Sequence, residues 1–203
     1  MKIICITGYR GSGKTTAIKI MANNLSNSAI IRGNIFLVYS LLKHTKEFEK
    51  IFKIPFDKEN PYDCIISAGN NDSVDNIERN RQFFKYIFPF IETEIEKAIN
   101  EQKSRGREFI LVEYVSLPIF KIWKQADYRV MIVSNKEQRG IKMCERMITM
   151  NESFKEEGWH NLSEKLFEDI IENAENIDFT VENRYNENYE KDLIHLCQKI
   201  AKK

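Results

Sequence analysis

Gly8-Tyr9-Arg10-Gly11-Ser12-Gly13-Lys14-Thr15 fits the pattern G-x-x-x-x-G-K-[ST] at every fixed position. The apolar run Met1–Thr7 before it predicts a buried β-strand, and the apolar residues after it recur at helical spacing. Glycine lets the backbone turn tightly round an anion with its N–H groups inward, and a helix that starts there adds the positive end of its dipole. This order of strand, loop and helix predicts a phosphate-binding loop. The alternative, a coincidental glycine-rich turn, is disfavoured by the same order.

The residues of the loop have separate predicted roles in holding ATP and Mg²⁺. Lys14 would reach the outer phosphates, and the Thr15 hydroxyl would hold the metal ion. Arg10 is a further candidate for a phosphate contact because of its position inside the loop. The predicted nucleotide-binding residues of the loop are Gly8, Arg10, Gly11, Ser12, Gly13, Lys14, Thr15 and Thr16.

Length and charge limit the classes of protein to be considered. A chain of 203 residues is long enough for one domain, and its net charge of +1 argues against nucleic-acid binding through a global positive field. It contains neither an apolar run of the roughly 18 residues that span a bilayer nor a signal-peptide pattern. We therefore expect a cytoplasmic monomer or small homo-oligomer that binds neither membranes nor nucleic acids. The scattered cysteines suit reduced, small apolar residues, and they are Cys5, Cys64, Cys144 and Cys197.

Strand-like runs alternate with helical patterns, which predicts an α/β fold with a mostly parallel sheet. The strands expected after the first are residues 29–31, 109–113, 128–133 and 178–182. Residues 35–42 are apolar enough for a buried helix. A long helical segment is expected to end near Ser104, with Pro89 opening its second part and Gly106 suiting the stop.

Further helices are expected over residues 136–149 and 162–174 and at the C-terminus. Asn161 and Glu164 have the spacing of a capping box at the start of the second of these helices. The closing helix has an apolar face of Leu193, Leu196 and Ile200. The sequence shows neither repeats nor a low-complexity linker, which predicts a single domain over residues 1–203.

The order of these pieces resembles the P-loop small-molecule kinases, and most closely the dephospho-CoA kinases. The loop matches fully, and Phe88-Pro89-Phe90-Ile91 is similar to the His-Pro helix start of that family. Residues 110–113, followed by Leu117, resemble its third strand, although Val115 stands where the family has proline. Residues 126–133 resemble its fourth strand, and residues 177–183 resemble its closing Ala-Asp-x-x-Ile-x-Asn segment.

The resemblance implies a P-loop NTPase fold with five parallel strands, helices on both faces, and the loop after the first strand. It implies ATP and Mg²⁺ as ligands and gives Asn183 a role near the nucleotide. It also implies an acceptor-side helical region over residues 35–105 and a lid over residues 136–175.

Two departures from the family concern the acceptor and the lid. Where the family has Asp-x-Asp at the end of the second strand, this chain has Arg32-Gly33-Asn34, and Asn34 cannot act as a base at neutral pH. Arg146 fits one lid arginine, but Met150 stands at the next position, and residues 163–171 contain no counterpart of the last one. Either the acceptor and mechanism differ from those of the family, or catalytic power is reduced.

Three further residues are candidates for the chemistry. Glu113 closes an apolar strand at the edge where parallel sheets bind ligands, which suits a metal ligand or a base. The alternative for Glu113 is the start of a solvated loop. Arg139 and Arg146 are two helical turns apart and would face the same side, to neutralise charge during transfer. A solvated basic face is the alternative for these two.

The sequence thus predicts ATP- and Mg²⁺-dependent phosphoryl transfer to a small, nucleotide-like acceptor, with dephospho-CoA as one possibility. A nucleoside or nucleoside monophosphate kinase would use the same loop and lid. A nucleotide-binding sensor or partner-binding subunit without transfer is the alternative from another class. A P-loop NTPase that drives a conformational change is the third.

Overall fold

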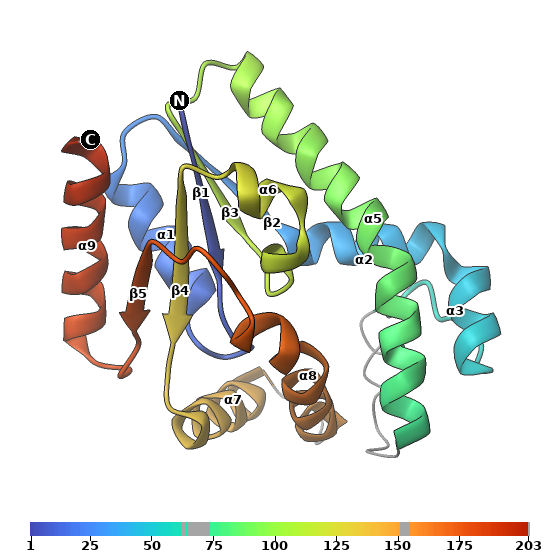
Figure 1. Cartoon of the computed structure of the whole chain (residues 1–203). Helices are drawn as coiled ribbons and strands as arrows, with labels where there is room; N and C mark the ends of the chain where they lie inside the picture. The colour runs from blue at the N-terminus through green and yellow to red at the C-terminus, as the bar shows by residue number, and fades with distance from the viewer. Residues whose placement is uncertain (62–63, 65–73, 151–154, 203) are drawn as a thin grey trace.

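The computed structural model describes residues 1–61, 64, 74–150 and 155–202, and within these it leaves out the side chains of 74–76, 143–144, 146–150 and 155–163. It contains a five-stranded sheet in the order β2-β3-β1-β4-β5, in which every neighbouring pair is parallel. The strands are β1 (Lys2–Thr7), β2 (Ser28–Arg32), β3 (Phe109–Glu113), β4 (Tyr128–Val133) and β5 (Phe179–Glu182). All five carboxyl ends therefore lie at one edge (Figure 1), and the predicted α/β fold is confirmed.

Alternate residues of the strands supply two separate cores, because successive side chains of a strand point to opposite faces. Ile4 and Ile6 of β1 pack with α1 (Lys14–Asn24) and α9 (Glu187–Lys202). In Figure 1 these two helices lie together on one side of the sheet. The loop after β1 is thus enclosed by α1, which starts at Lys14, and by the segment that leads into α9.

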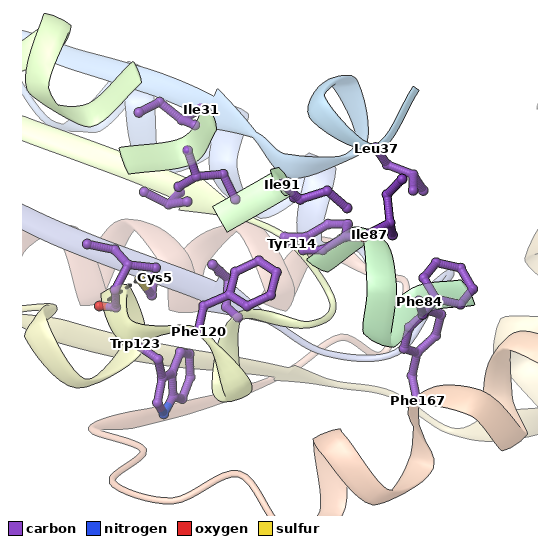
Figure 2. Packing of buried hydrophobic residues seen from close by; sticks show 14 of the residues in the cluster. Cys5, Ile31, Leu37, Phe84, Ile87, Ile91, Tyr114, Phe120, Trp123 and Phe167 are labelled. Atoms are coloured by element: carbon purple, nitrogen blue, oxygen red, sulfur yellow. Dashed lines mark hydrogen bonds between the residues drawn. The ribbon is translucent and has the colours of Figure 1, made fainter. Parts of the chain in front are cut away.

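Ile3 and Cys5 of β1 belong to the other core, which is rich in aromatic side chains. It is covered by α2 (Gly33–Lys43), α3 (Thr45–Phe52), α5 (Val74–Ser104), a 3₁₀ turn (Leu117–Ile119) and α6 (Lys121–Gln125). Figure 2 shows Tyr114, just after β3, between Phe120 and Ile91 of α5. The Tyr114 and Phe120 rings are stacked with centroids 5.9 Å apart.

The helices of the predicted lid region lie beyond the carboxyl ends of the central strands. α7 (Lys136–Met150) follows β4, and α8 (Lys155–Glu172) returns toward β5 (Figure 1). Phe84 of α5 and Phe167 of α8 pack with ring centroids 5.3 Å apart, which ties α8 to the second core (Figure 2). The lid and acceptor functions of these regions stay predictions.

The expectation of a buried helix over residues 35–42 is only half right. Leu37 and Leu41 of α2 are buried, but Ile35, Tyr39 and Leu42 are 60%, 44% and 40% exposed. α2 follows β2, the edge strand of the sheet, and packs against α5. One side of α2 therefore packs against the protein, while apolar side chains on its other side remain at the surface.

The expected long helical segment ending near Ser104 is confirmed, but Pro89 does not open a second part of it, because α5 runs unbroken from Val74 to Ser104. Proline removes the N–H that would bond to the carbonyl of Lys85. Pro89 and Lys85 are both exposed, so this carbonyl lies on the solvent side, where water can bind it. The predicted stop is confirmed, since Gly106 has φ 70° and donates its N–H to the Lys103 carbonyl at 3.0 Å.

The predicted capping box at Asn161 is also wrong. α8 begins at Lys155, so Asn161 lies inside the helix. Glu164 instead pairs with Arg139 of α7, and this tertiary contact overrides the local signal. The buried cysteines Cys5, Cys64 and Cys197 are not in disulfide bonds, whereas the Cys144 side chain lies outside the described residues. Among the described helices, none is long and apolar enough to cross a membrane.

Candidate phosphate and metal site

The loop between β1 and α1 has a backbone that only glycine accommodates at two points. Gly8 has φ 141° and Gly13 has φ 98°, both in the region that L side chains avoid. A Cβ at Gly8 would lie 2.2 Å from the Ile132 carbonyl oxygen, and one at Gly13 would lie 2.3 Å from Asn183 Nδ2. The curled loop is therefore wedged between the end of β4 and the segment after β5.

Lys14 is buried in this loop, and its Nζ donates to the Tyr9 carbonyl at 2.7 Å. Burial, together with the smaller effects of the nearby cations Arg10 and Arg139, lowers the pKa of Lys14 to about 8, against the opposing effect of the Glu113 carboxylate. The ammonium is thus enclosed with little compensating negative charge. A bound phosphate would supply that charge, as expected for the lysine of a phosphate loop.

Residues 183–189, which follow β5, form hydrogen bonds to the backbone of the loop. Three successive loop carbonyls accept hydrogen bonds from them: Gly11 from the Tyr185 hydroxyl (2.9 Å), Ser12 from Asn183 Nδ2 (2.9 Å) and Gly13 from the Tyr189 hydroxyl (3.0 Å). We call these three donors the carbonyl bracket. A peptide carbonyl points opposite to the following N–H, so donors on the carbonyl side favour N–H groups that face the other way, where the predicted phosphate would bind.

Asn183 was expected near the nucleotide, and the structure places it directly against the loop. It is only 4% exposed, and its Oδ1 accepts from the Tyr185 backbone N–H at 2.8 Å. Both the nitrogen and the oxygen of its side-chain amide therefore have hydrogen-bond partners within the protein. A contact between Asn183 and the nucleotide base stays a prediction.

Removing the tyrosine hydroxyls of the bracket should weaken triphosphate binding without unfolding the protein. Each hydrogen bond contributes about 0.5–1.5 kcal/mol, so Tyr185→Phe and Tyr189→Phe should each weaken ATP binding by roughly 2- to 12-fold. Calorimetric titration with a non-hydrolysable ATP analogue measures this effect. Tyr39→Phe, on the exposed side of α2, is the matched control and should bind as the wild type does. Wild-type affinity in the double variant would contradict the bracket's role.

Thr15 and Glu113 meet at the carboxyl edge of the sheet. Thr15 Oγ1 donates to Glu113 Oε1 at 3.1 Å, and Glu113 is only 3% exposed. Its second oxygen, Oε2, is buried without a hydrogen-bond partner, and the nearest cationic atom is Arg32 Nε at 3.6 Å. A hydroxyl beside a buried carboxylate oxygen with spare capacity fits Mg²⁺, which prefers oxygen ligands.

The remaining ligands of such an ion would come from phosphate oxygens and water. The described residues contain no group of three or more His, Cys, Asp and Glu side chains that could hold a metal alone. Mg²⁺ commonly binds through one or two protein oxygens together with substrate phosphates. Glu113 therefore does not simply begin a solvated loop, although its metal role stays a prediction.

Arg139 lies against the phosphate loop and is not part of a solvated face. It is 4% exposed, and its guanidinium carbon lies 4.6 Å from the centroid of the Tyr9 ring. The same guanidinium donates to Glu164 Oε2 at 2.7 Å and to the Ser134 carbonyl at 2.6 Å. A positive charge is thus held beside the loop by a buried carboxylate.

For the other predicted site residues the structure gives less detail about side-chain contacts. Arg146 lies on α7, but its side chain is outside the described residues. Arg10 is partly buried and close enough to Lys14 to lower the pKa of the lysine. Thr16 is exposed on the first turn of α1. Their catalytic and nucleotide-binding roles remain predictions.

Solved structures share the fold of this chain, whereas neither a known family profile nor a curated protein sequence matches it. A protein titled TT1252 from Thermus thermophilus aligns with a TM-score of 0.62 and 16% identity, over 99% of this chain and 97% of that one. A dephospho-CoA kinase from Campylobacter jejuni aligns with a TM-score of 0.50 and 19% identity, over 99% and 96%. A shikimate kinase from Bacteroides thetaiotaomicron has a TM-score of 0.51 and 12% identity, over 100% and 99%.

The chain has the P-loop kinase fold. Because the sequence identities are only 12% to 19%, these matches show a shared arrangement of the backbone. The resemblance expected from the sequence is therefore confirmed at the level of the fold. Within this fold the described site combines the loop, Lys14 and the Thr15–Glu113 pair at one sheet edge.

Sequence reasoning missed four residues of this candidate site. Tyr185 and Tyr189 follow the last strand with no motif to mark them, and Glu164 was assigned to a helix cap. Arg32 was noted only as a neighbour of Asn34. The signal for Arg32 is its position as the last residue of a strand, which places it at the ligand-binding edge.

Proposed function

We propose that the protein is an ATP- and Mg²⁺-dependent kinase that transfers the γ-phosphoryl group to a small, nucleotide-like acceptor. The observation that carries this proposal is the Thr15–Glu113 contact beside the buried Lys14, at the carboxyl edge of the sheet. The names of the dephospho-CoA and shikimate kinases that share the fold support transfer to a small molecule. We further propose that it acts in the cytoplasm as a monomer or small homo-oligomer.

Each residue has a defined task in this proposal. The loop N–H groups, directed by the carbonyl bracket, bind the β- and γ-phosphates, and Lys14 neutralises their charge. Thr15 and Glu113 would hold Mg²⁺, which supplies charge neutralisation between the two phosphates when it is bound. Little covalent chemistry is required of the protein, because phosphoryl transfer depends mainly on position and electrostatics.

Arg139 can serve the same transfer only after a rearrangement. Its guanidinium is paired with Glu164 at 2.7 Å, beside the Tyr9 ring. We propose that a phosphate oxygen replaces Glu164 as the partner of Arg139 when the nucleotide binds. Arg146, two turns further along α7, is the second candidate for this role.

The test is incubation of the purified protein with Mg-ATP and a panel of acceptors. The panel contains dephospho-CoA, nucleosides and nucleoside monophosphates, and mass spectrometry identifies any product with an added phosphoryl group. We expect one class of acceptor to be phosphorylated by the wild type and not by Lys14→Ala. If no compound gained a phosphoryl group, the kinase proposal would be abandoned.

The second candidate is a nucleotide-binding protein that does not transfer phosphate. The lack of a carboxylate at Asn34 and the engagement of Arg139 by Glu164 favour it. It predicts ATP binding with neither transfer nor hydrolysis. ATP hydrolysis coupled to a structural change, without an acceptor, would instead indicate a P-loop NTPase.

A further inference from the structure

The carboxyl end of β2 carries a cationic side chain, Arg32, that has no role in the kinase proposal above. Arg32 is the last residue of β2 and lies in register with Glu113 of β3. Its side chain is 42% exposed, so the guanidinium is accessible to a ligand at this edge. The contact of Nε with Glu113 Oε2, at 3.6 Å, is longer than a hydrogen bond.

The hydrogen-bonding capacity of Arg32 is therefore largely unused within the described part of the chain. Its Nε is buried without a hydrogen-bond partner, and Glu113 is its one ionic partner there. A guanidinium presents five N–H donors in a planar fork that matches a phosphate or carboxylate. Arg32 is thus suited to an anionic group located beside Glu113.

The backbone that follows Arg32 adds to this positive field. α2 begins at Gly33, and its first turn contains no acidic residue. A Cβ at Gly33 would lie 2.4 Å from Tyr114 Cγ, so the start of α2 is held tightly against the residue that follows Glu113. The positive end of the α2 dipole therefore lies at the same edge as the guanidinium.

Among the described residues, the carboxyl ends of β1, β2 and β3 offer no free carboxylate that could take a proton. Of the described residues at the carboxyl ends of β1, β2 and β3, Glu113 alone carries a carboxylate; its Oε1 accepts from Thr15 at 3.1 Å, and its Oε2 is the proposed Mg²⁺ ligand. Asn34 is exposed and carries an amide. A hydroxyl acceptor needs a base to take its proton, whereas a phosphate monoester, with a second pKa of about 6, is already an oxyanion at neutral pH.

We infer that Arg32 binds a phosphate group of the acceptor, and that an oxygen of this phosphate receives the γ-phosphoryl group. This inference rests on the proposed kinase activity and specifies its acceptor as a phosphorylated small molecule. A lone pair of the acceptor oxyanion forms a bond to the γ-phosphorus. The bond from the γ-phosphorus to the β,γ-bridging oxygen breaks, and its electron pair leaves with ADP. The product is a phosphoanhydride, and no proton is released in the step.

The inference is tested by binding and by product analysis. With the nucleotide site filled by a non-hydrolysable ATP analogue, nucleoside 5′-monophosphates and the matching nucleosides are titrated by calorimetry. We expect the monophosphates to bind at least tenfold more tightly than the nucleosides. Arg32→Gln should lose about 10- to 100-fold in monophosphate affinity, the range for hydrogen bonds to charged groups, while its affinity for the ATP analogue stays unchanged.

The matched control is Arg184→Gln, which removes an exposed arginine beyond β5 at the same sheet edge. This variant should behave as the wild type does. Unchanged affinity for the ATP analogue also shows that each variant is folded. Arg32→Lys keeps the charge but loses the planar fork, so it should recover only part of the affinity.

Phosphorus NMR of the transfer product separates this inference from the kinase proposal. A phosphoanhydride supports both, whereas a new phosphomonoester made on a hydroxyl would overturn the role of Arg32 and leave the kinase proposal intact. Equal binding of nucleosides and monophosphates, or equal binding by wild type and Arg32→Gln, would also overturn the inference. If monophosphates bind through Arg32 but no phosphoryl group is transferred, the kinase proposal fails and the anion site stands.

Discussion

Lys14→Ala is expected to lower phosphoryl transfer by about a thousandfold or more, because it removes the charge that neutralises the outer phosphates. Lys14 Nζ already lies inside the loop, 2.7 Å from the Tyr9 carbonyl. Since the Tyr9 carbonyl is the hydrogen-bond partner of the ammonium among the described residues, and burial of the charge is unfavourable, the variant should fold normally. Initial rates with saturating acceptor, and ATP affinity by calorimetry, measure the two effects separately.

The control for this substitution is Lys19→Ala, which removes an exposed lysine on the same helix. Lys19→Ala should keep the wild-type rate and ATP affinity. A Lys14→Ala enzyme with an unchanged rate would remove the basis for the phosphate site.

The same lysine should also affect stability, and in the opposite direction. Its pKa is 10.5 in the unfolded chain and about 8 in the folded protein, a difference that corresponds to about 3 kcal/mol. Between these two values the unfolded state binds more protons, so the free energy of unfolding rises with pH. Below pH 8 the buried charge destabilises the nucleotide-free protein.

Lys14→Met should therefore stabilise the nucleotide-free protein at pH 7 by roughly 2–3 kcal/mol, after loss of the Tyr9 hydrogen bond. It should also lose the rise in stability between pH 8 and 10.5 that Lys14 contributes. Urea titrations of both proteins at pH 7 and 10 measure this difference. A destabilised Lys14→Met at pH 7 would show that the ammonium is compensated within the protein.

Glu113→Gln is the second substitution with a large expected effect. It keeps the shape of the side chain and a hydrogen bond to Thr15 but removes the negative charge from the buried, proposed metal ligand. We expect the rate to fall about 100- to 1,000-fold, and the Mg²⁺ concentration for half-maximal rate to rise. Rates measured across a Mg²⁺ titration at fixed ATP provide both values.

Glu182→Gln is the matched control, since Glu182 ends β5 at the same sheet edge but is exposed and paired with Arg184. It should show the wild-type Mg²⁺ dependence. Should Glu113→Gln retain that dependence as well, the carboxylate would be a structural partner of Thr15 and Arg32 instead of a metal ligand.

The strands and the phosphate loop could be predicted because their signals are local. Strands such as residues 109–113 and 128–133 are short apolar runs, and buried strands of a parallel sheet require such runs. The loop carries its own motif, and Glu113 follows from the rule that ligands bind at the carboxyl edge of a parallel sheet. The strands and the loop can each be recognised from the residues of their own segment.

The errors and omissions depend on contacts between distant segments. The course of α5 through Pro89 depends on which side of the helix faces solvent, and the role of Glu164 depends on where Arg139 of α7 lies. Arg32 meets Glu113 only because β2 and β3 are neighbours in register. None of these facts is contained in the sequence pattern near the residue concerned.

The carbonyl bracket has a consequence for the order in which the protein becomes competent to bind. The ribosome makes Gly11 to Gly13 before the donors Asn183, Tyr185 and Tyr189, which follow more than 170 residues later. While these intervening residues are made, a nascent chain therefore carries the complete motif without the three donors of the bracket. High affinity for nucleotides is expected only after β5 and α9 have emerged from the ribosome. A chain that lacks them should bind ATP weakly.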